Sequence, residues 1–186
     1  MTTRTIFLTC LLAALAIGIA CSKANQGANT QKAAAKPTAT PPNVPAALPD
    51  EAFKAQITFV SPPAKLRAGE KVVVQVKIKN ASNVQWWARG AQFNTGTDSK
   101  FVVAAADRWL KADGSLLTNM DGRYGITKDL KPGEEDEVPL TVTAPTTPGD
   151  YILEVDVVQE AVAWFSDKGS PTAKTKISVS RGGRDG

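Results

Sequence analysis

The side chains that most often carry catalysis are scarce in this chain. Its 186 residues contain no histidine and two cysteines, Cys10 and Cys21. Without histidine, the chain lacks the usual general base near neutral pH and the usual ligand of zinc and copper. The carboxylates lie mostly at predicted turns, their spacing selects no glycosidase-like pair, and no glycine-rich phosphate loop is present. We therefore predict no catalytic residues and no cofactor, and a protein that is not an enzyme.

Calcium is the one metal worth weighing, because it needs only oxygen ligands. Residues 133–137 (Gly-Glu-Glu-Asp-Glu) form an acidic run at a turn. We interpret this run as a solvated loop whose charges keep a strand edge from pairing. Residues 94–99 are also rich in oxygen atoms, but they lack the spacing of a calcium loop. The expectation is that the chain holds no metal.

The four tryptophans are the remaining candidates for a functional role, in binding. Two of them, Trp86 and Trp87, are neighbours in the sequence. Another aromatic pair is Trp164 and Phe165. Side chains that follow each other on a strand face opposite ways. Each pair, if extended, therefore places one ring toward the core and one toward solvent.

The N-terminus carries a targeting signal. Arg4 precedes an apolar stretch, residues 6–20, in the pattern of a secretory signal peptide. At about 15 residues this stretch is too short to remain as a membrane-spanning helix. Residues 18–21 (Gly-Ile-Ala-Cys) resemble the lipobox of bacterial lipoproteins. The resemblance implies that residues 1–20 are removed and that Cys21 receives a diacylglyceryl group and palmitate.

Lipidation of Cys21 predicts that the protein is located at a membrane and that the membrane is its partner. Several acyl chains on one residue are enough for stable anchoring. In the enteric-type sorting rule an Asp after the cysteine retains a lipoprotein in the inner membrane, so Ser22 favours the outer membrane of the cell envelope. Cys10 leaves with the signal and Cys21 is capped, so the fold must rest on its core without a disulfide.

The mature chain divides into three parts. Residues 21–52 are rich in Ala, Lys, Thr and Pro without an apolar face, so we expect a disordered linker that the prolines stiffen. Residues 53–180 have the length of one domain with its own core. Residues 181–186 are polar and glycine-rich, which predicts a flexible tail. Loss of the single charge of Arg4 lowers the formal net charge from +4 to +3, compatible with weak attraction to anionic envelope polymers.

The domain is predicted to be all-β. Residues 71–79 alternate apolar and polar side chains with a period of two, as a half-buried strand does. Similar patterns, separated by turn signals, recur along the domain, and no helical pattern of useful length is found. The expected strands are residues 56–60, 71–79, 101–110, 115–117, 137–143, 151–159 and 173–179. About seven such strands predict an immunoglobulin-like β-sandwich.

Five short motifs follow one another in this domain. They are residues 80–86 (Asn-Ala-Ser-Asn-Val-Gln-Trp), 107–110 (Asp-Arg-Trp-Leu) with Asp113-Gly114, 130–134 (Leu-Lys-Pro-Gly-Glu), Ala144-Pro145 with 148–151 (Pro-Gly-Asp-Tyr), and 158–160 (Val-Gln-Glu) with Trp164-Phe165. Their order resembles the bacterial Ig-like domain often appended to surface-polysaccharide glycosyltransferases and methyltransferases. It is also similar to the four-tryptophan (FW) domain of autophagy receptors. The resemblance covers residues 57–179 and implies a non-enzymatic binding or spacer module.

The resemblance places Trp86 inward, which leaves Trp87 outward, at a position where the related pattern usually has proline. Exposed aromatic rings suit sugar faces and partner proteins. The aromatic residues expected in the core are Trp86, Trp109, Tyr151 and Trp164. The candidate binding residues are Trp87, Phe93 and Phe165.

Two functions are consistent with these observations. The first is a membrane-anchored binding module that recognises an envelope glycan or a partner protein through the face near Trp87. The alternative is a structural accessory subunit or spacer, docked through strand edges into a larger envelope assembly. No Lys/Arg cluster with interleaved aromatics is present, so nucleic acid is not an expected partner.

Overall fold

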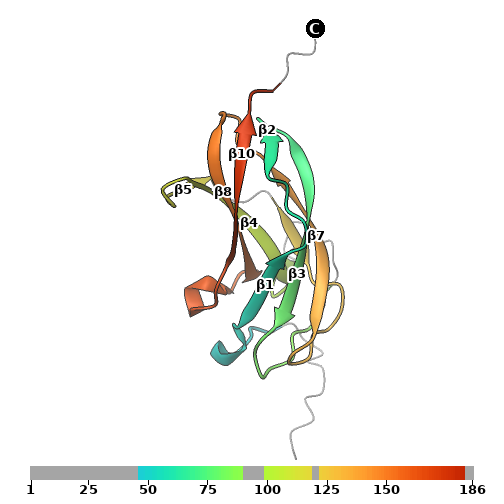
Figure 1. The fold of residues 1–186 in the computed structure, drawn as a ribbon. Helices are drawn as coiled ribbons and strands as arrows, with labels where there is room; N and C mark the ends of the chain where they lie inside the picture. The colour runs from blue at the N-terminus through green and yellow to red at the C-terminus, as the bar shows by residue number, and fades with distance from the viewer. Residues whose placement is uncertain (1–45, 90–98, 119–121, 183–186) are drawn as a thin grey trace, which may run out of the picture. The chain divides into compact units, whose positions relative to one another are not determined.

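The computed structural model describes residues 46–89, 99–118 and 122–182 (Figure 1). All of these belong to one unit, Thr40–Gly186, which is separate from Met1–Ala39. The signal peptide, Cys21, residues 21–45 of the predicted linker, and Phe93 lie outside the described residues. No helix in the described part of the chain combines the length and the apolar character needed to cross a membrane.

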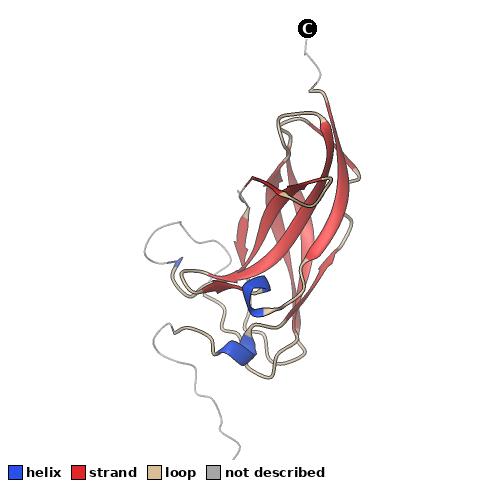
Figure 2. Cartoon of the chain, turned by 90° about the vertical axis from the view of Figure 1, so that its left-hand side faces the viewer, coloured by secondary structure: helices blue, strands red, loops and turns tan. Residues whose placement is uncertain are grey.

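Strands dominate the described chain, as the period-two patterns predict. In chain order the elements are η1 (Asp50–Ala52), β1 (Ala55–Phe59), β2 (Lys65–Arg67), β3 (Lys71–Asn80), β4 (Val103–Lys111), β5 (Leu116–Thr118), β6 (Arg123–Gly125), β7 (Glu135–Thr143), β8 (Gly149–Gln159), β9 (Ala163–Trp164), η3 (Ser166–Lys168) and β10 (Ala173–Ser180). Figure 2 shows the two short 3-10 helices, η1 and η3, at the same end of the strands.

The strands form two sheets. One has the order β1-β3-β7, and the other has the order β2-β10-β8-β4-β5, with β6 on β4 and β9 on β8. The chain crosses from the first sheet to the second between β1 and β2, where Pro62 and Pro63 cannot donate ladder hydrogen bonds. Strand β2 then runs parallel to β10, whereas the other pairs are antiparallel. This pairing confirms the predicted all-β, immunoglobulin-like sandwich.

The core fills the space between the two sheets. Inward residues alternate along each long strand, and burying one Val, Leu or Ile side chain contributes about 1.5–3 kcal/mol. The fully buried residues of β3, β7 and β8 that make up most of this layer are Val74, Val76, Ile78, Val138, Leu140, Val142, Leu153, Val155 and Val157. Strands β4 and β8 are covered on their other faces too, with Ala104 and Ala106 of β4 and Glu154, Asp156 and Val158 of β8 all buried.

The seven predicted strands correspond to β1, β3, β4, β5, β7, β8 and β10. Strands β2, β6 and β9 were not predicted, because two or three residues are too few to show a period. The domain also begins earlier than residue 53, since Ala52 is buried and the Leu48 N–H donates to Gln159 Oε1 at 2.8 Å. These contacts are tertiary, and no local pattern signals them.

One inward position of β4 holds a carboxylate instead of an apolar group. Asp107 is fully buried, and its Oδ1 accepts the N–H of Gly122 at 2.7 Å. A Cβ atom on Gly122 would clash with the Thr141 carbonyl oxygen of β7 and lie 2.7 Å from Asp107 Oδ1. Only glycine therefore fits between β4 and β7 at this point.

We expect Gly122→Ala to lower the free energy of unfolding by about 1–3 kcal/mol, because the methyl group has no room and the backbone must shift. Urea unfolding followed by tryptophan fluorescence measures the change. Gly182→Ala is the control, since a Cβ atom at this position would lie 3.8 Å from the Ala68 carbonyl oxygen, an ordinary van der Waals distance. Equal losses of stability in the two variants would show that the close contact of Gly122 with Thr141 and Asp107 does not exclude a side chain at position 122.

Candidate functional site

Several loops and the N-terminal segment meet at one end of the sandwich, which we call the loop end (residues 46–53, 81–89, 99–102, 126–134 and 160–172). Trp86 joins three of them. Its backbone exchanges two hydrogen bonds of 2.9 Å with Leu130, and its indole N–H donates to the Ala52 carbonyl at 3.0 Å. The Trp86 side chain is fully buried. The residue that follows it is therefore held in a defined position.

Trp87 is half-buried at this end, so part of its ring meets solvent. It borders a hollow of about 20 Å³ whose other lining residues are Ala46, Leu48, Arg89, Phe101, Val103 and Gln159. Cavities that enclose small ligands measure about 300–1,000 Å³. The part of the hollow that the described residues line is too small to enclose such a ligand, so we treat the rings around it as a contact surface.

Phe101 is the second ring of this surface and has an unusual backbone. Its φ angle is 69°, in the left-handed region that side chains with a Cβ rarely adopt. The Phe101 N–H donates to the Glu160 carbonyl at 2.9 Å, and Gln159 Nε2 donates to the Phe101 carbonyl at 3.3 Å. Ala161, in the adjoining turn, also has a positive φ of 60°. Backbone strain of this kind concentrates at binding sites.

Two cations flank the two rings. Lys100 is exposed, with its Nζ 4.8 Å from the centroid of the Phe101 ring, and Arg89 is half-buried beside Trp87. Among the described residues, no ion pair involves either cation. We call Trp87, Arg89, Lys100 and Phe101 the Trp87 surface. Sequence reasoning identified only Trp87, because nothing local in the sequence marks the other three as its neighbours.

The second aromatic pair has the opposite orientation from the one predicted. Phe165 is fully buried and packs against Phe53 and Trp86, with ring centroids 4.9 Å and 5.1 Å away. It is therefore a core residue and not part of a binding surface with Trp87. Trp164 is half-buried, and its pairing with Val158 places it on the outer face of the sheet. The strand ends at Trp164, because Phe165 already has helical φ and ψ angles of −66° and −34°.

On that outer face, Trp164 covers a patch of small side chains. Beneath it lie the buried residues Val102, Ala104, Ala106 and Val158. The guanidinium carbons of Arg108 and Arg123 are 4.7 Å and 4.9 Å from its ring centroid. Contacts of this type contribute about 0.5–2 kcal/mol each. The role of Trp164 is to shield the sheet.

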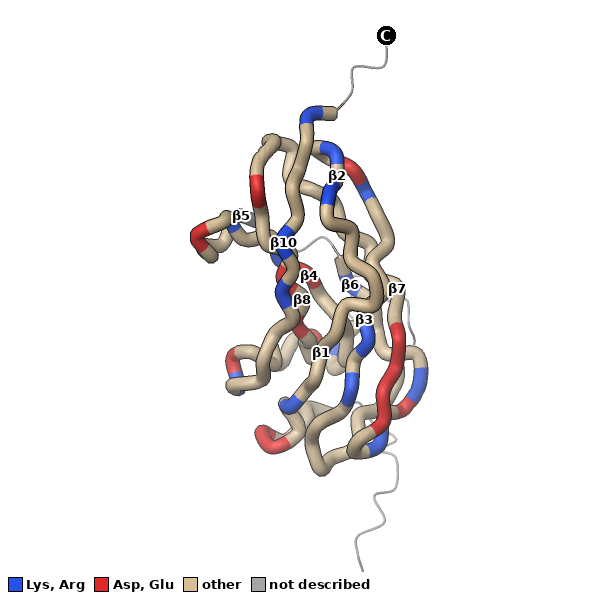
Figure 3. Tube along the Cα trace, in the orientation of Figure 1, with Lys and Arg blue, Asp and Glu red and all other residues tan. Residues whose placement is uncertain are grey.

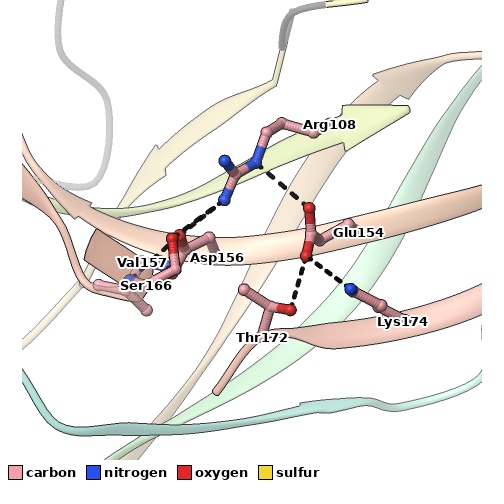
Figure 4. Close-up of polar contacts among 7 residues, drawn as sticks. All are labelled: Arg108, Glu154, Asp156, Val157, Ser166, Thr172 and Lys174. Carbon is pink, nitrogen blue, oxygen red and sulfur yellow. Dashed lines mark hydrogen bonds and ion pairs between the residues drawn. The ribbon is translucent and has the colours of Figure 1, made fainter. Parts of the chain in front are cut away.

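A polar network fixes Arg108 beside this patch (Figure 4). Arg108 forms a 2.8 Å ion pair with Asp156 and a 3.4 Å ion pair with Glu154. Glu154 also accepts the Thr172 hydroxyl at 2.7 Å and pairs with Lys174 at 3.3 Å. Because each carboxylate already has a cationic partner, the network joins β4, β8 and β10 rather than presenting a catalytic carboxylate pair.

Asp156 is the most buried member of this network, with a side chain that is 0% exposed. Burial raises the pKa of its carboxyl above the ordinary value of 3.8, although hydrogen bonds from Ser166 and Val157 and the charge of Arg108 act in the opposite direction. Its oxygens accept the Val157 N–H at 2.7 Å and the Ser166 N–H at 3.4 Å. Asp156 thereby attaches η3 to the sheet.

The remaining predicted core aromatics lie at the far end from the loops. Trp109 is fully buried. Tyr151 is half-buried, with its ring 6.4 Å from Trp109 at 85° and its hydroxyl donating to the Thr147 carbonyl at 2.8 Å. A hollow of about 370 Å³ beside it is lined by Ala112, Asp150, Tyr151, Ile152, Lys176, Ile177 and Ser178. Within it, Asp150 and Ser178 already bond to each other at 2.5 Å.

The acidic run at residues 133–137 is divided between two environments. Glu135 and Glu137 are exposed along β7, and Glu135 pairs with Lys77 of β3 at 3.1 Å. Figure 3 shows the acidic stretch of β7 in red and basic positions of β3 in blue. Asp136 instead turns inward and accepts the Thr127 N–H at 2.6 Å. No group of three or more carboxylate or cysteine side chains gathers as a metal-binding cluster in the described ranges.

Comparisons with known proteins give only distant likenesses. No protein-family model and no curated protein matches the chain. Among solved structures, it is similar to the CARDB domain of the PF1109 protein from Pyrococcus furiosus, crystallised in complex with di-metal ions (16% identity, TM-score 0.38, 68% of this chain and 86% of that chain). It is similar to part of a beta-glucosidase from Listeria innocua (18%, 0.37, 68% and 16%) and to the sporulation control protein Spo0M from Bacillus subtilis (16%, 0.35, 68% and 48%). Likenesses this weak carry no argument about ligand or activity.

The burial of Phe165 and the partial exposure of Trp164 predict how much each ring contributes to stability. Phe165→Ala should cost about 3–5 kcal/mol, because it opens a cavity against Phe53 and Trp86. Trp164→Ala should cost less, about 1–3 kcal/mol, since part of that ring already meets solvent. Urea unfolding of both variants gives the order. A larger loss for Trp164→Ala would mean that its ring, and not that of Phe165, fills the core.

The raised pKa of Asp156 predicts a pH dependence. When a carboxyl has a higher pKa in the folded chain than in the unfolded chain, its protonated form stabilises the fold. This contribution is complete below the pKa of the unfolded chain and is lost as the pH rises through the pKa of the folded chain. We therefore expect the free energy of unfolding of the wild type, relative to that of Asp156→Asn, to fall as the pH rises above 3.8. Urea unfolding at a series of pH values measures the difference. A difference that grows with pH would show that pairing with Arg108 outweighs burial.

Proposed function

We propose that this protein is a lipid-anchored, non-catalytic binding module of the bacterial cell envelope, and that it recognises a glycan or a protein partner through the Trp87 surface. The observation that carries the proposal is the placement of Trp87. Its neighbour Trp86 is locked in the core, which holds the half-buried Trp87 beside Phe101 and Arg89. A rigid, partly solvent-exposed aromatic ring is the kind of residue that dominates binding energy.

The proposed anchor is the lipid on Cys21, with the outer membrane favoured over the inner one. The lipobox-like residues 18–21 and the serine at position 22 support this part of the proposal. Ala46, the first residue that the structure describes, lines the hollow beside Trp87.

Two features favour recognition over the alternatives. The buried carboxylates Glu154 and Asp156 are committed to Arg108, so they support structure rather than acid–base chemistry. Docking through strand edges has less support, because the strands at the sheet edges are unsuited to it. Strands β1, β2 and β5 have five, three and three residues, and β7 contains Pro139 among exposed glutamates.

Crosslinking in intact envelopes, followed by pull-down, tests the binding role. We expect Trp87→Ala to lose a glycan or protein that the wild type captures, because the variant removes the ring without disturbing Trp86. Leu116→Ala is the matched control, since Leu116 is 55% exposed on β5, away from the loop end. Identical partners in the wild type and in Trp87→Ala would contradict the assignment of this surface.

The same envelopes test the anchor separately. In Cys21→Ser we expect the protein to appear in the soluble fraction and to lose palmitate labelling, because the residue that would carry the lipid is gone. Membrane retention of this variant would contradict lipid anchoring while leaving the binding surface unaffected.

A further inference from the structure

We infer that the partner of the Trp87 surface is an acidic glycan, a polysaccharide that carries carboxylates on its sugar rings. The inference deepens the proposed function and rests on it. It starts from a shallow hollow that is bordered by Trp87, Phe101 and Arg89, with Lys100 over the Phe101 ring.

The rings provide the apolar half of this recognition. Trp87 and Phe101 are both half-buried, so each is held by the domain while part of its ring meets solvent. Trp86 fixes the position of Trp87, and hydrogen bonds to Glu160 and Gln159 hold Phe101 in its strained backbone conformation. Rings that are already ordered lose little entropy on binding. Such rings suit the flat C–H faces of sugars.

The cations provide the charged half. Lys100 Nζ lies over the Phe101 ring, 4.8 Å from its centroid, and so covers one face of that ring. An anion bound by this ammonium group would lie beside a sugar stacked on Trp87. The nearby acids are already committed, since Asp129 accepts the Ala88 N–H at 2.8 Å and Glu160 pairs with Arg123 at 2.8 Å. Neither Arg89 nor Lys100 forms an ion pair within the described ranges. Charge-assisted hydrogen bonds from such cations to carboxylates are stronger than neutral ones.

The surroundings favour a glycan over a membrane surface or a protein. Membrane insertion needs exposed apolar tips, and Val162, at 39% exposure, is the one exposed large apolar residue of the described loop end. A protein anchor side chain needs a pocket to fill. The hollow beside Trp87 has a volume of about 20 Å³, too small for such a side chain. A stacked, flat and charged ligand requires neither feature.

The test uses the full mature chain in detergent and two matched probes, an oligogalacturonate and the same oligosaccharide with its carboxylates methyl-esterified. Isothermal titration calorimetry should detect binding of the acid form and a loss of at least about fivefold on esterification. Arg89→Gln and Lys100→Gln should each weaken binding by about two- to fivefold, and added salt should weaken it further. Trp87→Ala should weaken binding of the acid form at least about fivefold. Lys65→Gln, at an exposed position of β2 outside the loop end, should change nothing.

Three results would overturn the inference, and each is distinguishable from failure of the proposed function. Equal binding of the oligogalacturonate and its methyl ester would show that the protein binds glycans without selecting for carboxylates. No binding of either probe, together with a protein partner that is lost in Trp87→Ala, would assign the surface to protein recognition. Binding to phosphatidylglycerol vesicles that depends on Arg89, without binding to the oligogalacturonate, would assign it to lipid headgroups.

Discussion

Trp86 ties together three segments that are far apart in the sequence. Its indole N–H donates to the Ala52 carbonyl before the first strand, its backbone exchanges hydrogen bonds with Leu130 before β7, and its ring packs edge-on against Phe165 after β9. The loops of this end belong to different strands of both sheets, and Trp86 is one of the residues that hold them together. The position of Trp87, and with it the candidate surface, depends on a neighbour that never meets solvent.

A second constraint acts on the outer face of the larger sheet. The central strand β8 is buried on both faces, and its outer side chains include two carboxylates, Glu154 and Asp156. Charges at such positions are tolerable only when they are paired. Arg108 supplies the pairing and also stacks on Trp164, so one side chain serves both the polar network and the apolar cover. The short elements β9 and η3 are held to the sheet by these contacts and by the insertion of Phe165 into the core.

The two ends of the molecule are therefore built differently. Around Tyr151 and Trp109, Asp150 accepts the Ser178 hydroxyl and the Tyr151 hydroxyl donates to the Thr147 carbonyl. At the loop end, Trp87 and Phe101 border a shallow hollow together with Arg89, and Lys100 lies over the Phe101 ring. The half-buried Trp87 ring beside Arg89 and Phe101 distinguishes the surface that we assign to recognition.

The sequence by itself determined the fold class, because a period of two shows which residues of a strand share a face whatever the strand packs against. It also determined the lack of histidine chemistry and identified Trp87 as a candidate. The tertiary structure alone decided which ring of Trp164 and Phe165 is inside, because alternation relates the two faces to each other but does not say which one meets the core. That choice followed from pairing with Val158 and from the helical backbone at Phe165. It likewise decided that Arg89, Lys100 and Phe101 surround Trp87, since contacts between loops leave no periodic trace in a sequence.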